Sequence, residues 1–269
     1  MVESAGHLNP GDPEVALSRF VLGEPAAPAG DALVELVRHV WVARWDVPPG
    51  EVRTQRVLTY PAANAVLQPS GATLHGPSRV LATQDLAGRS WVVGVLLRPA
   101  ATRVLTATEP ARLVGRGEAL PGAPLPAVAS AMGQARDAAD RAVAALLRAW
   151  LTPVADRVDD AGRLANAACR VAEERADVLR VADLADLLGT TTRTLSRVVR
   201  QHTGLTPKWL IECRRLQAAA TTLFADPSTD LAGLAADLGY TDQAHFTRRY
   251  RAVVGETPAR TRRHAPAAA

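Results

Sequence analysis

One segment of the chain occurs twice near the C-terminal end. The first copy, LADLLGTTTRTLSRVVRQHTGLTP, spans 184–207, and the second, LAADLGYTDQAHFTRRYRAVVGETP, spans 234–258. The first leucines of the copies are 50 positions apart, whereas their later glycines, Gly204 and Gly255, are 51 apart. One extra residue in the turn of the second copy accounts for the difference. Matching segments of this kind indicate one structural element used twice.

Each copy is predicted to form two helices around a glycine turn. The apolar stripe of the first helix consists of Val181, Leu184, Ala185 and Leu188 in copy one, and of Leu231, Leu234, Ala235 and Leu238 in copy two. Gly189 and Gly239 follow, where the end of a helix favours a residue that tolerates positive φ. Thr191 and Thr241 are the predicted N-caps of the second helices. Helix, turn and capped helix are the parts of a helix-turn-helix.

The second helices, predicted over 192–203 and 242–254, separate an apolar face from a basic one. Their inward residues are Leu195, Val198 and Val199 in copy one, and Phe246, Tyr250 and Val253 in copy two. The segment 191–201 contains three arginines and no acidic residue. Arginine reads guanine with two hydrogen bonds and glutamine can read adenine. The pattern therefore favours two helices that enter the major groove of DNA.

A long helix is predicted between the copies, from Pro207 to about Phe224. Thr206 and Pro207 form a good N-cap and N1 pair, and Asp226-Pro227 ends the helix. If this helix is rigid, it fixes the separation of the two units. Recognition helices held in this way can enter successive major-groove turns, about 34 Å apart.

The charge of the chain is uneven. Residues 163–269 hold 16 Lys and Arg against 11 Asp and Glu, whereas residues 1–162 hold 15 against 16. All of the excess positive charge lies in the C-terminal part, which favours an anionic partner such as double-stranded DNA. The length of 269 residues favours two domains.

The sequence predicts an α+β protein with four parts. A flexible arm over 1–30 is followed by a β-rich domain over 31–126, of barrel or sandwich type, a helical linker over 127–158, and an all-α double helix-turn-helix domain over 159–269. Short β-branched or aromatic runs between Pro and Gly residues predict strands at 39–47, 52–60, 64–69, 79–84 and 91–99. In the linker, apolar residues at helical spacing predict one helix over 127–151 that ends at Pro153, and a further helix follows over 159–174.

The C-terminal part resembles the AraC/XylS family of bacterial transcription regulators. The resemblance covers about 163–263 and rests on GTTTRTLSRVVRQHTGLTPKWL, RRLQAAATTL and the second copy. It implies that Arg193, Ser196 and Arg197 in the first unit, and Gln243, Ala244, His245, Thr247 and Arg248 in the second, contact DNA. The outward position of Arg200 on the first recognition helix adds it to this set. The sequence departs from the family at Val254, where an aromatic residue is usual, and at Thr261, where tyrosine is usual. Both departures concern packing at the end of the domain.

The N-terminal half resembles, less specifically, the β-rich sensor domains that precede this DNA-binding unit. VWVARWDVPPG and GVLLRP carry the likeness. It implies a sensing or dimerising role and identifies no ligand. Trp41, Trp45 and Trp91 fit core packing better than an effector pocket.

Neither a metal nor a cofactor is expected. His39 and His75 have no second histidine or carboxylate at ligand spacing. Cys169 and Cys213 are 44 positions apart and read as buried apolar residues, which favours a reducing cytoplasm. The longest apolar run, 91–97, is too short to span a bilayer, and no signal peptide is visible.

The leading hypothesis is a sequence-specific regulator of transcription that is not an enzyme. Two alternatives stay open: an N-terminal enzyme with a DNA-binding appendage, and an architectural protein that coats DNA without choosing sequence. No nucleophile elbow or phosphate loop supports the first. Beyond DNA, the sequence leaves open RNA polymerase, an unidentified small-molecule effector and a second copy of the chain as partners.

Overall fold

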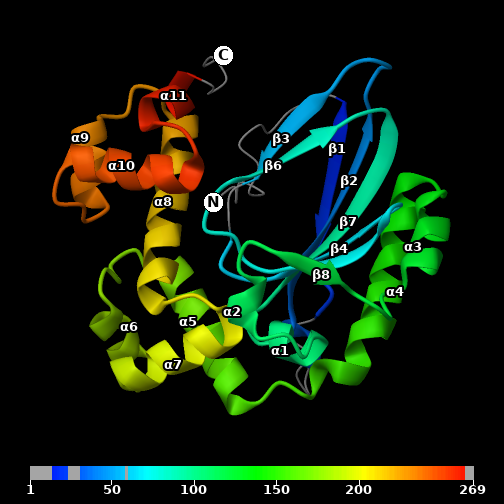
Figure 1. Cartoon of the computed structure of the whole chain (residues 1–269), viewed down its shortest axis with the longest axis horizontal. Helices are drawn as coiled ribbons and strands as arrows, with labels where there is room; N and C mark the ends of the chain where they lie inside the picture. Colours follow the sequence, from blue (N-terminus) through cyan, green and yellow to red (C-terminus); the bar gives the residue numbers. More distant parts are fainter. Residues whose placement is uncertain (1–13, 24–30, 58–59, 264–269) are drawn as a thin grey trace.

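The computed structural model describes residues 14–23, 31–57 and 60–263 of the chain. A β-rich N-terminal part precedes an all-helical C-terminal part, as the sequence predicts (Figure 1). The larger sheet is antiparallel and has the order β1 (Val15–Phe20), β2 (Val37–Asp46), β7 (Arg89–Leu97), β4 (Asn64–Gln68), β5 (Gly71–His75) and β8 (Gly117–Ala119). A separate two-stranded sheet pairs β3 (Arg53–Val57) with β6 (Ala82–Leu86).

The predicted arm over 1–30 is wrong for 15–20. These residues form β1, which pairs along its whole length with β2, from Val15 opposite Trp45 to Phe20 opposite Val40. The sequence around 15–20 is rich in glycine and proline and does not favour a strand by itself. The strand is stabilised by backbone hydrogen bonds to β2, which is distant in the sequence. The rest of the predicted arm, 1–13 and 24–30, lies outside the described residues.

The predicted helix over 127–151 is two helices, α3 (Leu125–Met132) and α4 (Arg136–Ala155). Gly133 ends the first of them. Pro153 lies inside α4 rather than ending it. A proline removes one backbone hydrogen bond, but Leu151 and Ala155 on either side of it are buried and hold the last turn in place.

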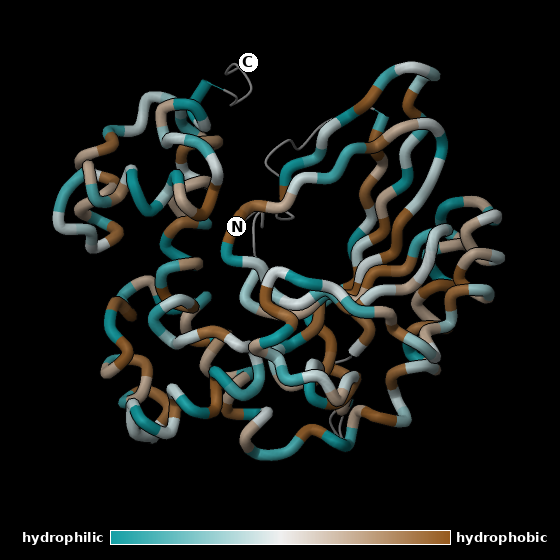
Figure 2. The backbone as a smooth tube through the Cα atoms, in the orientation of Figure 1, coloured by the Kyte–Doolittle hydropathy of each residue, from teal (hydrophilic) through white to brown (hydrophobic). Residues whose placement is uncertain are grey.

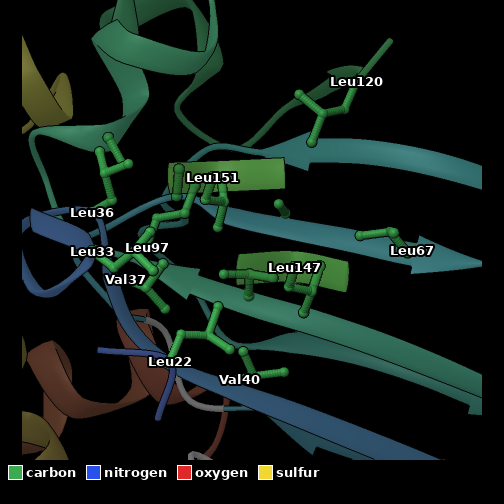
Figure 3. Close-up of a cluster of buried hydrophobic side chains, with 14 of the residues drawn as sticks. Leu22, Leu33, Leu36, Val37, Val40, Leu67, Leu97, Leu120, Leu147 and Leu151 are labelled. Atoms are coloured by element: carbon green, nitrogen blue, oxygen red, sulfur yellow. The ribbon is translucent and has the colours of Figure 1, made fainter. Parts of the chain in front are cut away.

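The segment predicted as a linker contributes to the core of the N-terminal part. Val128 of α3 and Val143, Leu147 and Leu151 of α4 belong to one buried cluster with side chains of the large sheet. Figure 3 shows Leu147 and Leu151 among the leucines and valines of this cluster. Apolar residues are concentrated along the central strands and in α4 (Figure 2). The helices α3 and α4 therefore belong to the packed N-terminal domain.

Three short helices were not predicted within the β-rich domain. They are η1 (Ala32–Glu35), α1 (Ala101–Leu105) and α2 (Pro110–Leu113). The loops around them meet the C-terminal part through α5 (Asp160–Glu174), whose Asn166 is buried. The Asn166 amide accepts a hydrogen bond from the Ala100 backbone N–H at 2.9 Å and donates one to the Glu35 carbonyl at 2.9 Å. An ion pair of 2.7 Å between Arg38 and Glu173 joins the same two parts.

The C-terminal part contains the two predicted units on either side of a long helix, α8 (Pro207–Ala225). The first unit consists of α6 (Val181–Leu187) and α7 (Thr192–Thr203), and the second of α9 (Leu231–Asp237) and α10 (Gln243–Val254), followed by α11 (Pro258–Arg263). The units lie at opposite ends of α8 (Figure 1), and each has its own buried cluster. Among the described helices, none combines the length and apolar character needed to cross a membrane.

Candidate nucleic-acid interface

The recognition helices α7 and α10 begin at side-chain caps. The Thr191 hydroxyl accepts a hydrogen bond from the backbone N–H of Thr194 at 3.1 Å, as predicted. In the second unit the prediction of Thr241 is wrong, because Asp242 is the N-cap and accepts from the His245 N–H at 2.6 Å. Thr191 and Asp242 are 51 positions apart, so the extra residue of the second copy lies before the cap. An N-cap side chain satisfies an otherwise orphaned backbone donor.

Both recognition helices end at glycines in the left-handed region. Gly204 has φ of 71° and Gly255 has φ of 78°. The surroundings of the two glycines differ. A Cβ at Gly204 would lie 2.7 Å from the Pro110 carbonyl oxygen and from Ala111 Cα, whereas a Cβ at Gly255 would meet nothing within 4 Å. The end of α7 is therefore in close contact with α2.

This difference gives a matched pair of stability predictions. We expect Gly255→Ala to lower the free energy of unfolding by about 1 kcal/mol, the cost of a Cβ in the left-handed region. We expect Gly204→Ala to cost roughly 1 kcal/mol more, because the added Cβ overlaps the backbone of α2. Urea unfolding of the two variants measures the difference. Equal losses of unfolding free energy in the two variants would show that α2 moves away from the added Cβ without an energetic penalty.

The predicted faces of α7 are observed. Leu195, Val198 and Val199 are buried. The predicted outward residues Arg193, Arg197 and Arg200 are exposed, and Ser196 is half-buried beside them. Arg197 donates a hydrogen bond to the Gln201 side chain at 3.1 Å and otherwise faces solvent. The first unit thus presents three guanidinium groups on one side of a 12-residue helix.

The second recognition helix has a less uniform outer face. Gln243, Ala244 and Arg248 are exposed, whereas His245 and Thr247 are half-buried. The His245 ring meets the Tyr240 ring edge-on, with centroids 5.4 Å apart. The residues available to a groove lie mainly at the N-terminal end of α10.

Arg249, the neighbour of Arg248 on α10, is held by α8. Its guanidinium donates to both carboxylate oxygens of Glu212, at 2.5 and 2.6 Å. These bonds raise the pKa of Arg249. A two-pronged pair of this kind fixes orientation, so Arg249 positions α10 against α8.

A second contact between α8 and the second unit has no local sequence signal. The Arg215 guanidinium lies over the Tyr240 ring, 4.0 Å from its centroid. Burial raises the pKa of Tyr240 to about 12. Arg215 stands in the RRLQ segment, which the family likeness covers without marking Arg215 as a contact residue. The stacking joins the long helix to the turn of the second unit.

The other residues singled out in the sequence do not gather into a site. His39 is buried and His75 exposed, and among the described residues no group of three metal-ligating side chains occurs. Cys169 and Cys213 are buried, and burial raises the pKa of both thiols. Trp41 covers Gly94 on the neighbouring strand.

Two capped helices that carry arginines, in duplicated units at the ends of one helix, define a double helix-turn-helix domain. Residues 184–264 match the family of helix-turn-helix domains, and residues 26–117 match a domain of unknown function (DUF6597). The C-terminal part of the chain is an AraC-type helix-turn-helix domain preceded by a β-rich domain, which confirms the resemblance to the AraC/XylS family. No curated protein matches the chain significantly.

Several solved structures are similar to the chain. A probable AraC family transcriptional regulator from Rhodopseudomonas palustris CGA009 is 25% identical over 38% of this chain and 97% of that chain, with a TM-score of 0.35. The C-terminal domain of AraT, a response regulator from Geobacillus stearothermophilus, is 22% identical over 39% and 88%, with a TM-score of 0.35. ToxT from Vibrio cholerae O395, bound to (E)-4-(8-methylnaphthalen-1-yl)but-3-enoic acid, is 11% identical over 94% and 98%, with a TM-score of 0.42.

Proposed function

We propose that the chain regulates transcription by reading two successive major-groove segments of DNA with α7 and α10. The observation that carries the proposal is the exposure of Arg193 and Arg197 on one unit and of Gln243 and Arg248 on the other. These side chains have the donors and acceptors that base edges require. In this proposal Ser196, Arg200, Ala244, His245 and Thr247 complete the two contact surfaces.

We further propose that the N-terminal domain modulates DNA binding, in response to a small molecule or to self-association. The direct contacts between the two parts support this, since Asn166 and Glu173 of α5 are bound to residues of the N-terminal domain. A change in that domain therefore has a structural route to the DNA-binding units.

Selection of binding sites from a random pool of duplexes tests the proposal. We expect the full chain to enrich one sequence and to protect about 20 base pairs, the length of two groove turns. Binding to the selected duplex should be far tighter than to a scrambled one at the same salt concentration. Binding that is equally tight on all duplexes, with a steep salt dependence, would instead mark an architectural protein.

A further inference from the structure

The N-terminal domain touches both helix-turn-helix units at equivalent places. In the first unit, Gly204 at the end of α7 lies against α2. In the second, the Leu81 backbone N–H donates to the Val253 carbonyl at the end of α10, at 2.7 Å, and the Leu81 side chain packs against the buried cluster of that unit. Both contacts are at the C-terminal ends of the recognition helices. The N-terminal ends, with Arg193 and Gln243, stay exposed.

The contact with the second unit includes an ion pair shielded from water. Arg56 of β3 lies 3.1 Å from the Glu256 carboxylate, and the two side chains are 17% and 4% exposed. Arg260 approaches the same carboxylate at 3.6 Å, but its own side chain is 63% exposed. Removing Arg56 would take the shielded counter-charge away from the buried Glu256 carboxylate and leave it the more exposed and more distant Arg260. Arg56 therefore contributes to holding the segment after α10 against the N-terminal domain.

Hydrogen bonds continue from this ion pair into the recognition helix. The Thr261 hydroxyl donates to Glu256 at 2.7 Å and accepts from the Tyr250 hydroxyl at 2.9 Å. Tyr250 is a fully buried residue of α10, and burial raises its pKa. Thr261 is one of the two departures from the family pattern, and its hydroxyl links the inward face of α10 to the carboxylate that Arg56 binds.

The strand that carries Arg56 is well placed to transmit a change. In the described sheets β3 pairs only with β6, and these two strands form a sheet separate from the six-stranded one. A lone two-stranded ribbon is marginally stable, so its position depends on what it packs against. A shift of the ribbon relative to the large sheet would therefore move Arg56 and change its ion pair with Glu256.

We propose that the Arg56–Glu256 pair and the contact between α2 and Gly204 form a clamp that sets the relative position of the two recognition helices. This inference rests on the proposed reading of DNA by both units. Because the clamp leaves both basic faces open, it preorganises the units for a duplex that they engage together. Linked modules gain affinity when their geometry allows simultaneous contact, and preorganisation lowers the cost of ordering them.

The test compares Arg56→Gln and Glu256→Gln with Arg53→Gln. Arg53 lies on the same strand, but its partners, Glu14 and Glu51, belong to the N-terminal domain. The probes are the duplex selected by the unmodified chain and the same duplex with the half read by α10 scrambled. We expect the first two variants to bind the intact duplex about three- to tenfold more weakly and the scrambled one unchanged. Arg53→Gln should bind both like the unmodified chain.

Unchanged or tighter binding of Arg56→Gln to the intact duplex would overturn the clamp. An equal loss of affinity for the scrambled duplex, or the same loss with Arg53→Gln, would also overturn it.

A second readout needs no DNA. Spin labels on Ala182→Cys and Ala232→Cys, exposed equivalent positions of α6 and α9, report the distance between the units. We expect Arg56→Gln to broaden that distance distribution, and an unchanged distribution would contradict the clamp. Failure of the unmodified chain to select any duplex would instead refute the proposed function.

Discussion

Phe246→Ala is expected to remove the second DNA-reading unit while leaving the first intact. Phe246 is fully buried, and its ring contacts those of Tyr240 and Tyr250, with centroids 5.3 and 5.5 Å away. Truncating a buried phenylalanine costs about 3–5 kcal/mol. The cluster around it is separate from those of the first unit and of the N-terminal domain. The loss should therefore be local.

Hydrogen exchange of the backbone amides measures this effect. We expect faster exchange in α9 and α10, little change in α6 and α7, and loss of protection on one half of the selected duplex. Leu195→Ala is the matched control, because Leu195 is the equivalent buried residue 51 positions earlier. In Leu195→Ala the amides of α6 and α7 should exchange faster, and those of α9 and α10 should change little. If amide exchange became uniformly faster along the chain in both variants, the two units would not be separately stabilised.

Arg197→Ala and Arg248→Ala are expected to weaken binding to the selected duplex and to relax its sequence requirement. Each arginine is exposed on its recognition helix, and the two are 51 positions apart in the repeat. Loss of an arginine that reads a base costs about 1–3 kcal/mol, which is roughly a 5- to 150-fold change in Kd. Because the two units are well separated, the losses should add in the double variant.

Repeating the site selection with each variant shows which base pairs are affected. We expect Arg197→Ala to relax one half of the site and Arg248→Ala the other. Arg251→Ala is the control, since Arg251 is an exposed arginine in the last turn of α10. It should weaken binding slightly on all duplexes, as loss of a phosphate contact would. If Arg248→Ala weakens binding equally on all duplexes, as Arg251→Ala is expected to do, base reading by Arg248 is excluded.

Most of the local structure of the helix-turn-helix units follows from residues that lie close together in the sequence. The glycines at 189, 204, 239 and 255 all have positive φ, and Thr191 and Thr206 cap the helices predicted after them. Capping and left-handed glycines act over three or four residues, so their signals are present in the local sequence. The 51-residue offset of the repeat also relates the cap Asp242 to Thr191, whereas the predicted Thr241 follows the 50-residue offset that holds only before the turn.

Contacts between residues far apart in the sequence depend on how the whole chain folds. β1 exists because β2 pairs with it, and α4 continues past Pro153 because both neighbouring turns pack into the core. Arg249 pairs with Glu212, 37 positions away, and Arg56 pairs with Glu256, 200 positions away. No local pattern marks such partners, since the energy of an ion pair depends on burial and distance that only the folded chain fixes.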